Sequence, residues 1–305
     1  MSAPASVVTI GNLDGVHLGH QRLVGRAVGL AREHGLRAVA LTFDPHPATL
    51  LRPERAPLLL QPIEERSALL RSHGIDHVEV VAFDRELAAL EPDAFVTRIL
   101  VERLGARHVV VGENFRYGRG AAGDVAALER AGSAAGFGVT RVGLVVAGGV
   151  PVSSTAVREA VASGEVERAT TLLGRPFSLA GEVVAGDGRG RTIGVPTANV
   201  AYGAGLVLPA DGVYAGHARV VGASGPEGPG AACVINVGHR PTFDGRTRTV
   251  EAHLLDVEPD LYGQRLSVTF EHRLRGEQRF DSAQALVERI RADVALARTR
   301  LSEGA

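Results

Sequence analysis

The segment Val7–His20, VVTIGNLDGVHLGH, constrains the fold of this chain more than any other feature. It begins with the short apolar, β-branched run Val7–Ile10, which is typical of a buried strand. A turn rich in glycine, asparagine and aspartate follows, and Leu18–His34 has the apolar spacing of an amphipathic helix. A strand, a tight turn and a helix start surround one point with free backbone N–H groups and the positive end of a helix dipole. The segment therefore predicts an anion site in an α/β domain.

The side chains of this segment suggest a triphosphate as the anion. His17 and His20 lie three residues apart, so both rings can reach one phosphate from the first turn of the helix. The turn adds four further candidates for ATP or phosphate binding, Gly11, Asn12, Asp14 and Gly15. Taken alone, the two histidines could equally be polar residues on a helix surface. In this context we interpret the segment as a site for a nucleoside triphosphate.

The first half of the chain alternates predicted strands with predicted helices. Strands are expected at 7–10, 38–43, 77–81, 108–111 and 139–146, and helices at 18–34, 63–73, 92–104, 124–135, 153–162 and 165–173. This order is typical of βαβ crossovers and predicts a Rossmann-like parallel sheet of the nucleotidyltransferase type. Ligands bind beyond the carboxyl ends of such strands. We expect four loops to converge there, carrying His17 and His20, Asp44 and His46, Glu113–Tyr117, and Ser153–Arg158.

The segment Ser153–Arg158 has serine and threonine hydroxyls at the start of a predicted helix and an arginine one turn later. These groups are suited to binding a phosphate. The same hydroxyls could be no more than an N-cap.

The sequence Asp44-Pro45-His46-Pro47 is most simply a rigid turn, with a metal-binding role for His46 as the alternative. Each of these motifs is weak alone, and their placement on successive strand ends is what favours a nucleotide site.

The sequence pattern changes near Gly174, and we place a boundary that gives domains of residues 1–175 and 176–305. Short β-type runs punctuated by glycine then predict a small antiparallel barrel, at 178–185, 213–221, 232–237, 249–256 and 266–274. A C-terminal helix is expected from Asp281 to about Leu301, with Asp281 and Gln284 as a capping box.

The barrel half contains a second candidate site. Within residues 186–199, four glycines free the backbone to approach a phosphate, Gly186, Gly188, Gly190 and Gly194. Thr197 and Asn199 alternate along an extended segment, so a hydroxyl and an amide share one face, as hard oxygen ligands of Mg²⁺ would. A glycine-rich hairpin explains the segment equally well in isolation. Glu251 lies on an alternating strand and is either solvent-facing or, if it points inward, a general base.

Composition narrows the function further. The formal net charge of -1, without blocks of like charge, argues against nucleic acid as the main partner. All 33 basic residues are arginine, so a Walker A lysine is excluded. Cys233 is the single cysteine and is expected to be a buried, inert thiol. The sequence has neither a secretory signal nor a membrane-spanning run, so we expect a cytoplasmic protein without a membrane partner.

Seven motifs, spread in one order over nearly the whole chain, resemble the bifunctional bacterial riboflavin kinase/FMN adenylyltransferase family, also called FAD synthetase. Four resemble its α/β adenylyltransferase module: GNLDGVHLGH, TFDPHP, VVVGENFRYG and VSSTAVR. Three resemble its kinase module, which has a six-stranded barrel and a terminal helix: GDGRGRTIGVPTAN, NVGHRPTF and LRGEQRFDS. The chain departs from the family at Leu13, where phenylalanine is usual, and at Pro151, where a basic residue is common.

The resemblance implies roles for individual residues. It places His17 and His20 on the ATP phosphates as catalytic residues and makes Glu251 the base of the kinase. The phosphate-binding motif S-S-T-x-x-R is matched by Ser154, Thr155 and Arg158. Thr197 and Asn199 match the Mg²⁺–ATP ligands, and the flavin would contact Asn114, Tyr117, Arg275 and Phe280.

The implied function is flavin cofactor biosynthesis in two ATP-dependent steps, with Mg²⁺ as cofactor and ATP as co-substrate. Riboflavin is phosphorylated to FMN, and FMN is then adenylylated to FAD with release of pyrophosphate. Two alternatives stay open, an adenylyltransferase for another phosphorylated metabolite and a non-catalytic flavin-binding protein. The expected partners are riboflavin, FMN, FAD and ATP, and the sequence leaves self-association open.

Overall fold

The structure is a computed structural model that describes residues 3–186, 194–222, 225–226, 230–242, 245–257 and 259–303. Its contacts form two compact units, Met1–Ser154 and Thr155–Ala305, which are described separately. This division falls earlier than the expected boundary at residues 175 and 176, because the second unit includes α8 (Val166–Leu173) and all but the first residue of α7 (Ser154–Ser163). Gly188 and Gly190 of the predicted phosphate segment lie outside the described residues.

The first unit is built on a parallel sheet, as predicted. Its strands are β1 (Ser6–Ile10), β2 (Arg37–Asp44), β3 (His77–Ala82), β4 (Ala106–Gly112) and β5 (Gly138–Val142). All neighbours pair in parallel, in the order β3-β2-β1-β4-β5. The chain steps outward from β1 to β3 and then returns to β4 on the other side of β1. The crevice beyond the carboxyl ends of β1 and β4 is thus the topological switch point, where such sheets bind ligands.

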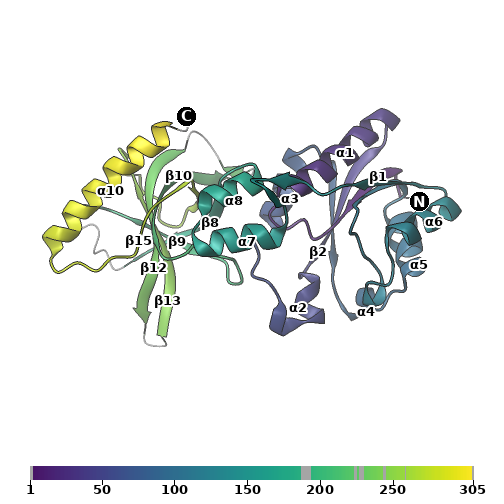
Figure 1. Cartoon of the computed structure of the whole chain (residues 1–305), viewed down its shortest axis with the longest axis horizontal. Helices are drawn as coiled ribbons and strands as arrows, with labels where there is room; N and C mark the ends of the chain where they lie inside the picture. The colour runs from purple at the N-terminus through teal and green to yellow at the C-terminus, as the bar shows by residue number, and fades with distance from the viewer. Residues whose placement is uncertain are drawn as a thin grey trace. The chain divides into compact units, whose positions relative to one another are not determined.

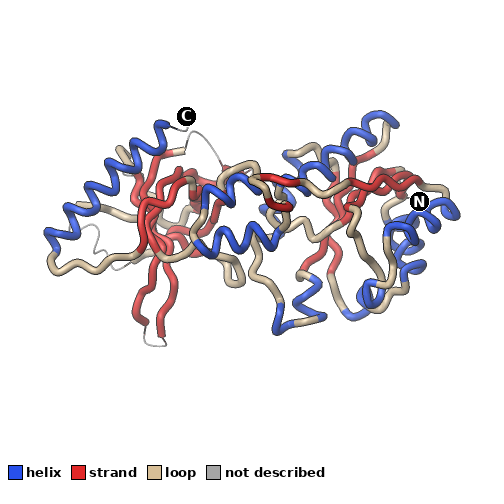
Figure 2. The backbone as a smooth tube through the Cα atoms, in the orientation of Figure 1, coloured by secondary structure: helices blue, strands red, loops and turns tan. Residues whose placement is uncertain are grey.

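Helices cover both faces of this sheet (Figure 2). They are α1 (Leu18–His34), α2 (Pro47–Leu51), α3 (Ile63–Ser72), α4 (Arg85–Ala88), α5 (Pro92–Phe95), a π-helical stretch (Val96–Arg103) and α6 (Val125–Ala135). Neighbouring strand residues point to opposite faces, so Val7 packs in the core that includes α1 while Val8 packs in the core that includes α6. The expected N-cap Asp124 is confirmed, since its carboxylate accepts a hydrogen bond from the backbone N–H of Ala127 at 2.8 Å.

One predicted strand of the first unit is too long. The strand expected over 139–146 ends at Val142, and β6 (Val146–Ala147) instead pairs with β7 (Val150–Pro151) in a separate hairpin. Glycines at positions 148 and 149, both with positive φ, supply the reversal between them. Apolar periodicity alone did not separate the two elements.

The second unit contains the predicted six-stranded barrel (Figure 1). Its strands are β8 (Phe177–Val184), β9 (Ala198–Tyr202), β10 (Gly212–Gly222), β12 (Ala231–Thr242), β13 (Gly245–Leu254) and β14 (Arg265–Phe270). They pair antiparallel in the order β10-β12-β13-β9-β8-β14, and pairing of β14 with β10 closes the ring. Two short strands, β11 (Gly225–Pro226) and β15 (His272–Gly276), also pair with β10.

The predicted C-terminal helix is α10 (Ala283–Glu303), which packs against β10, β12 and β15. The capping box expected at Asp281 is wrong by one residue: the hydroxyl of Ser282 accepts the hydrogen bond from the backbone N–H of Ala285 at 3.1 Å. The side chain of Gln284 donates instead to Glu288, one turn along the helix. Adjacent serine and aspartate are comparable capping residues, so composition does not decide between them.

Two candidate active sites

The turn after β1 is held in an unusual backbone conformation. Leu13, Gly15 and Val16 have positive φ values of 51°, 85° and 39°, and Val16 is β-branched, which makes this conformation costly. Both apolar side chains are fully buried beneath the turn. Leu13, one of the two departures from the family pattern, therefore fills the core under the turn.

A buried ion pair holds the turn from below. The carboxylate of Asp14 is fully buried, accepts a hydrogen bond from the backbone N–H of Leu60 at 3.1 Å, and lies 3.6 Å from the guanidinium of Arg66. Arg66 is 2% exposed and donates to the carbonyl oxygen of Asn12 at 2.9 Å. A buried carboxylate of this kind organises the backbone and does not face a ligand. These contacts give the Asp14 carboxylate a structural role in the turn, and its part in phosphate binding stays a prediction.

The two histidines of the motif occupy different positions. His17 is the N-cap of α1: its Nδ1 accepts a hydrogen bond from the backbone N–H of His20 at 3.3 Å, and only 5% of the residue is exposed. The ring of His20 stacks on it with centroids 3.6 Å apart and is less deeply buried. A Cβ at Gly19 would lie 3.1 Å from the His17 ring, so glycine makes room for this arrangement.

The loops beyond the sheet meet in two groups. The side-chain amide of Asn12 is 3.0 Å from Nε2 of His46, and the hydroxyl of Ser154 donates to the carbonyl oxygen of Asp14 at 2.9 Å. The loops after β1 and β2 and the start of α7 therefore lie together. The loops after β4 and β5 meet where the backbone N–H of Leu144 donates to Glu113 at 3.4 Å. Thr155 and Arg158 continue α7 in the second unit, and their place in a triphosphate site stays a prediction.

His46 has a structural explanation. Its Nδ1 accepts a hydrogen bond from the backbone N–H of Ala48 at 3.1 Å, which makes it the N-cap of α2. Together with the contact to Asn12, this favours the rigid-turn interpretation over a metal-binding role.

Tyr117, the residue expected to stack on the flavin, is packed inside the first unit. This side chain is 6% exposed, and its ring packs 5.6 Å from that of Phe95 and 5.7 Å from that of Phe115. Burial also raises the pKa of its hydroxyl. The ring faces are covered by core residues because a glycine at position 123, where a Cβ would lie 2.7 Å from the ring, lets the chain close over it. Asn114 is exposed, and Phe115 is partly exposed in the same loop.

In the barrel, the predicted catalytic residues are brought together by strand register. Glu251 on β13 pairs with Asn199 on β9 and, on its other side, with Asn236 on β12. Directly opposed residues in antiparallel strands have Cβ atoms about 5 Å apart. The same row continues through Val213 on β10 to Arg275 on β15. Five strand positions that are distant in the sequence thus form one line across the barrel wall.

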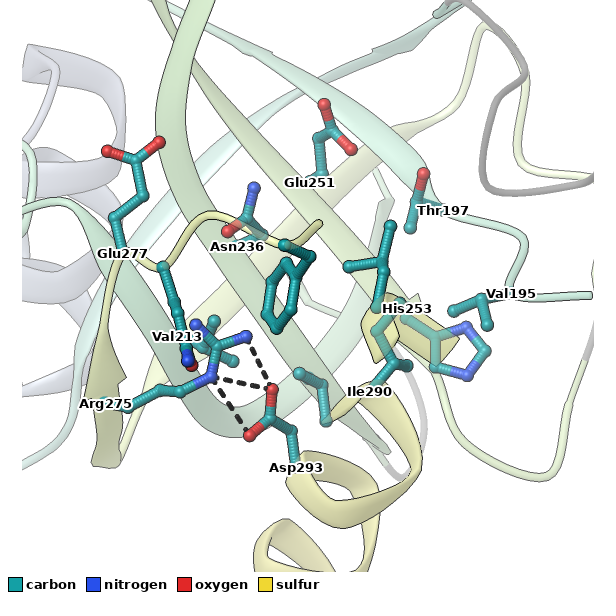
Figure 3. Close-up of a pocket in the computed structure, with 14 residues that line it drawn as sticks. Val195, Thr197, Val213, Asn236, Glu251, His253, Arg275, Glu277, Ile290 and Asp293 are labelled. Atoms are coloured by element: carbon teal, nitrogen blue, oxygen red, sulfur yellow. Dashed lines mark hydrogen bonds and ion pairs between the residues drawn. The ribbon is translucent and has the colours of Figure 1, made fainter. Parts of the chain in front are cut away.

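Four residues of this row, all except Asn199, line a cavity of about 330 Å³ (Figure 3). Thr197, Glu251 and Asn236 lie toward one end of the cavity, while Arg275 and Asp293 lie at the other. Apolar side chains line much of its wall: Val195, Val213, Val234, Phe280, Leu286 and Ile290. A cavity of this size, largely apolar with a few convergent polar groups, is typical of a site for an organic ligand.

Two contacts define the position of the segment that carries Thr197 and Asn199. Nδ1 of His253 donates to the carbonyl oxygen of Pro196 at 2.8 Å, which holds the segment to β13. A Cβ at Gly186 would lie 2.2 Å from the amide nitrogen of Asn199, so only glycine leaves room for that amide. A second cavity of about 550 Å³ adjoins this segment and shares Thr197 with the first. Gly194, another predicted phosphate residue, lines the second cavity.

The other end of the first cavity is built on α10. The guanidinium of Arg275 donates to the carboxylate of Asp293, with N–O distances between 2.8 and 3.2 Å. The Arg275 guanidinium also lies 5.8 Å from the centre of the Phe280 ring. Both predicted flavin residues of the barrel therefore line this cavity.

Three cavity residues escaped sequence reasoning: Asn236, His253 and Asp293. Asn236 is the first residue of the motif NVGHRPTF, so the resemblance of this motif to the kinase module could have indicated it. His253 follows Glu251 by two residues and so shares its strand face. Asp293 sits in an arginine-rich helix, where nothing local marks it.

The structure bears on two expectations that came from composition, the inert cysteine and the absence of a membrane-spanning helix. Cys233 is fully buried, and burial raises the pKa of its thiol, as predicted for an inert cysteine. Within the described ranges, every helix is too short or too polar to cross a membrane.

Comparison with known proteins agrees with this architecture. Residues 1–156 match the FAD synthetase family model, and residues 173–301 match the riboflavin kinase model. The bifunctional riboflavin kinase/FMN adenylyltransferase of Escherichia coli K12 is 42% identical, over 96% of this chain and 91% of its own length. That of Pseudomonas fluorescens is also 42% identical, over 96% and 92%. A Streptococcus pneumoniae crystal structure, titled as a macrolide-efflux protein, superposes with a TM-score of 0.88 at 31% identity and covers 98% of this chain and 95% of its own. With two domain models in this order and full-length relatives, the chain belongs to the family of bifunctional riboflavin kinase/FMN adenylyltransferases.

Proposed function

We propose a division of labour between the two units, with FMN adenylylation at the crevice of the parallel sheet and riboflavin phosphorylation at the barrel. The chain has riboflavin kinase and FMN adenylyltransferase activity and acts in flavin cofactor biosynthesis, with ATP as co-substrate. The observation that carries the division is the pair Glu251 and Asn236 at one end of a largely apolar cavity, with Asn199 beside Glu251 on the neighbouring strand.

At the barrel, Glu251 acts as the general base. It takes the proton of the riboflavin 5′-hydroxyl as that oxygen attacks the γ-phosphorus of ATP, and ADP leaves. Asn199 and Asn236 flank the carboxylate and can orient it by hydrogen bonding. The half-buried position of Glu251 at one end of a largely apolar cavity supports this role.

The two cavities divide the substrates. The first has the apolar walls and the aromatic ring of Phe280 that a flat isoalloxazine needs, and Arg275 offers N–H donors to flavin carbonyl groups. The second adjoins the glycine-rich segment and takes the nucleotide. Thr197 lines both cavities and therefore marks where the hydroxyl and the γ-phosphate meet.

Thr197 and Asn199 fit a magnesium ion. A hydroxyl and an amide oxygen are hard ligands, and so small a protein ligand set suits an ion that keeps water and phosphate oxygens. When bound, Mg²⁺ supplies charge neutralisation of the phosphates.

Adenylylation needs no base, because the attacking group, the phosphate of FMN, is already anionic. Its oxygen attacks the α-phosphorus of ATP, and pyrophosphate leaves. The requirement is charge stabilisation and orientation. His20 is the more accessible histidine and contacts the phosphates, while the buried His17 positions it. Gly11, Asn12 and Gly15 contribute backbone groups, and Ser154 contributes a hydroxyl.

Glu251→Gln tests the assignment of the kinase site. The substitution keeps size and removes the base, so FMN formation should fall by about 10² or more. Conversion of added FMN to FAD should be unchanged, because it occurs in the other unit. Both products are measured by chromatography after incubation with ATP and Mg²⁺. Loss of both activities would contradict independent sites.

His20→Ala is the reciprocal test. It should reduce FAD formation from FMN by about 10² while FMN formation from riboflavin stays intact, since a positioned cation or donor at the phosphates is lost. FAD synthesis at the wild-type rate would remove His20 from the mechanism.

The remaining expectations concern partners. A net charge of -1, without blocks of like charge, argues against nucleic acid as the main partner, and we propose small molecules as the main ligands. Self-association stays an open prediction, which sedimentation at several protein concentrations would test.

A further inference from the structure

Asp293 is a buried carboxylate in the floor of the first cavity, and the reaction itself gives it no role. Its side chain is 2% exposed. A carboxylate buried to this extent is unfavourable unless it is paired with good geometry. Two arginines supply the pairing: Arg275 from β15, at 2.8 Å, and Arg289 from the preceding turn of α10, at 3.1 Å.

A bulge in β15 makes the pairing with Arg275 possible. Residues two apart on a strand normally face the same side. Val213 pairs with Arg275 while the next residue, Tyr214, pairs with Arg273, so β15 has one extra residue, Leu274, at this point. Because of this extra residue, Arg273 and Arg275 point in different directions. Arg273 donates to the carbonyl oxygen of Ser163 at the end of α7, away from the cavity. Arg275 turns toward α10 instead.

The donors of Arg275 are only partly used. Nε and Nη2 donate to Asp293, and Nη1 donates to the carbonyl oxygen of Gly276 at 3.0 Å. A guanidinium has five N–H groups. Among the described residues, one N–H on each terminal nitrogen has no hydrogen-bond partner, and Arg275 borders the cavity (Figure 3). These two groups are the ones available to a ligand.

We propose that Asp293 is a positioning residue for the flavin. It fixes the guanidinium of Arg275, and because Arg275 contacts Phe280, it also helps to position the Phe280 ring in the cavity wall. The fixed fork presents its two remaining N–H groups to the carbonyl oxygens of the bound flavin. This inference rests on the assignment of the first cavity to riboflavin.

Asp293→Asn is the direct test. The amide keeps the shape but loses the charge, and it leaves two guanidinium groups beside each other without a counter-charge. The KM for riboflavin should rise about tenfold, which corresponds to ~1.4 kcal/mol. The kcat should change by less than about threefold, because Glu251 and the phosphate ligands lie at the other end of the cavity. FAD formation from added FMN serves as an internal control and should not change.

A matched control separates positioning from helix docking. Asp256 and Arg298 form a second ion pair between α10 and the residues after β13, with two N–O distances of 2.7 Å, outside the cavity. Asp256→Asn removes that attachment and should leave the riboflavin KM unchanged. An equal rise in KM in both variants would overturn the proposal, because docking of α10 would then explain the effect.

A double-mutant cycle gives the decisive readout. If Asp293 acts through Arg275, Asp293→Asn should have no further effect on riboflavin KM in an Arg275→Gln background. Independent, multiplying effects would contradict the proposal. If Asp293→Asn does not fold, Asp293→Glu keeps the charge but displaces the carboxylate. It should raise KM in the wild-type background and not in the Arg275→Gln background, and additivity there would equally contradict the proposal.

The same experiments distinguish failure of this inference from failure of the cavity assignment. If Glu251→Gln abolishes FMN formation while Asp293→Asn leaves KM unchanged, the cavity assignment stands and the role of Asp293 is refuted. If Glu251→Gln retains FMN formation, the cavity assignment itself is refuted, and with it the basis of the proposal.

Discussion

At the scale of single residues, burial separates side chains that the sequence makes look alike. His17 and His20 are equivalent in the motif, yet one caps a helix from a buried position and the other stacks on it with a more accessible ring. Asp14 and Tyr117 were expected at ligands and are instead covered by protein. A side chain that organises a site and one that contacts the ligand can therefore occupy neighbouring positions of one motif.

His17→Ala tests this division. Loss of the N-cap acceptor should lower the free energy of unfolding by about 1 kcal/mol. FAD formation should fall because the His20 ring loses the partner on which it stacks. Thermal unfolding and FAD chromatography measure the two effects.

His17→Asn provides the control, because asparagine is a good N-cap residue without an imidazole ring. It should recover the stability but not the FAD synthesis. Full recovery of activity would mean that the ring of His17 serves only as a cap.

At the scale of elements, close backbone approach determines where the barrel can close. Strand β14 passes so near β10 that a Cβ at Gly216 would lie 1.8 Å from the carbonyl oxygen of Thr269. Gly181 on β8 meets the same restriction against Ala201 on β9, at 2.1 Å. The glycines that punctuate the second half of the sequence thus include strand positions as well as turns.

Gly216→Ala should therefore open or distort the barrel. Overpacking of this kind is destabilising by about 3 kcal/mol or more, because the obstacle is backbone and cannot rotate away. Riboflavin phosphorylation should fall together with the stability of the second unit, while FAD formation from FMN persists. Thermal unfolding and the two activity assays provide the measurements.

Gly25 in the middle of α1 offers a contrasting substitution. A Cβ there meets nothing within 4 Å, and alanine in a helix is favoured over glycine by about 0.5–1 kcal/mol. Gly25→Ala should raise the melting temperature. A similar outcome for Gly216→Ala would contradict the packing argument for the barrel.

At the scale of the whole molecule, the helix α8 belongs to the kinase unit more closely than the sequence boundary suggests. It packs against β8 and β15 and buries Val166, Ala169, Leu172 and Leu173. Glu167 accepts a hydrogen bond from the backbone N–H of Arg273 at 3.1 Å. The strand that carries Arg275 is therefore attached to α8 on one side and to α10 on the other.

A pair of truncations checks this attachment. The chain from Thr155 onward should have a higher melting temperature than the chain from Pro176 onward, because the latter exposes the apolar surface that α8 covers. The chain from Thr155 onward should also bind riboflavin more tightly, because β15 keeps its contacts with α8. Equal stability and riboflavin KM in the two truncated chains would show that residues 155–175 are dispensable for the kinase unit.

Local patterns in the sequence determined the order and type of most elements, because strand and helix periodicity and turn chemistry depend on residues close together in the chain. They also made Thr197, Asn199 and Glu251 candidate site residues, and the family resemblance gave these residues their roles. The tertiary structure alone decided which residues share a cavity. Asn236 lies beside Glu251 because of strand register, and Asp293 reaches Arg275 because of a bulge and the docking of α10. These relations join residues in different strands and helices, which no local pattern specifies. Burial, likewise, depends on the whole fold, which is why the positions of His17 and Tyr117 could not be predicted from their motifs.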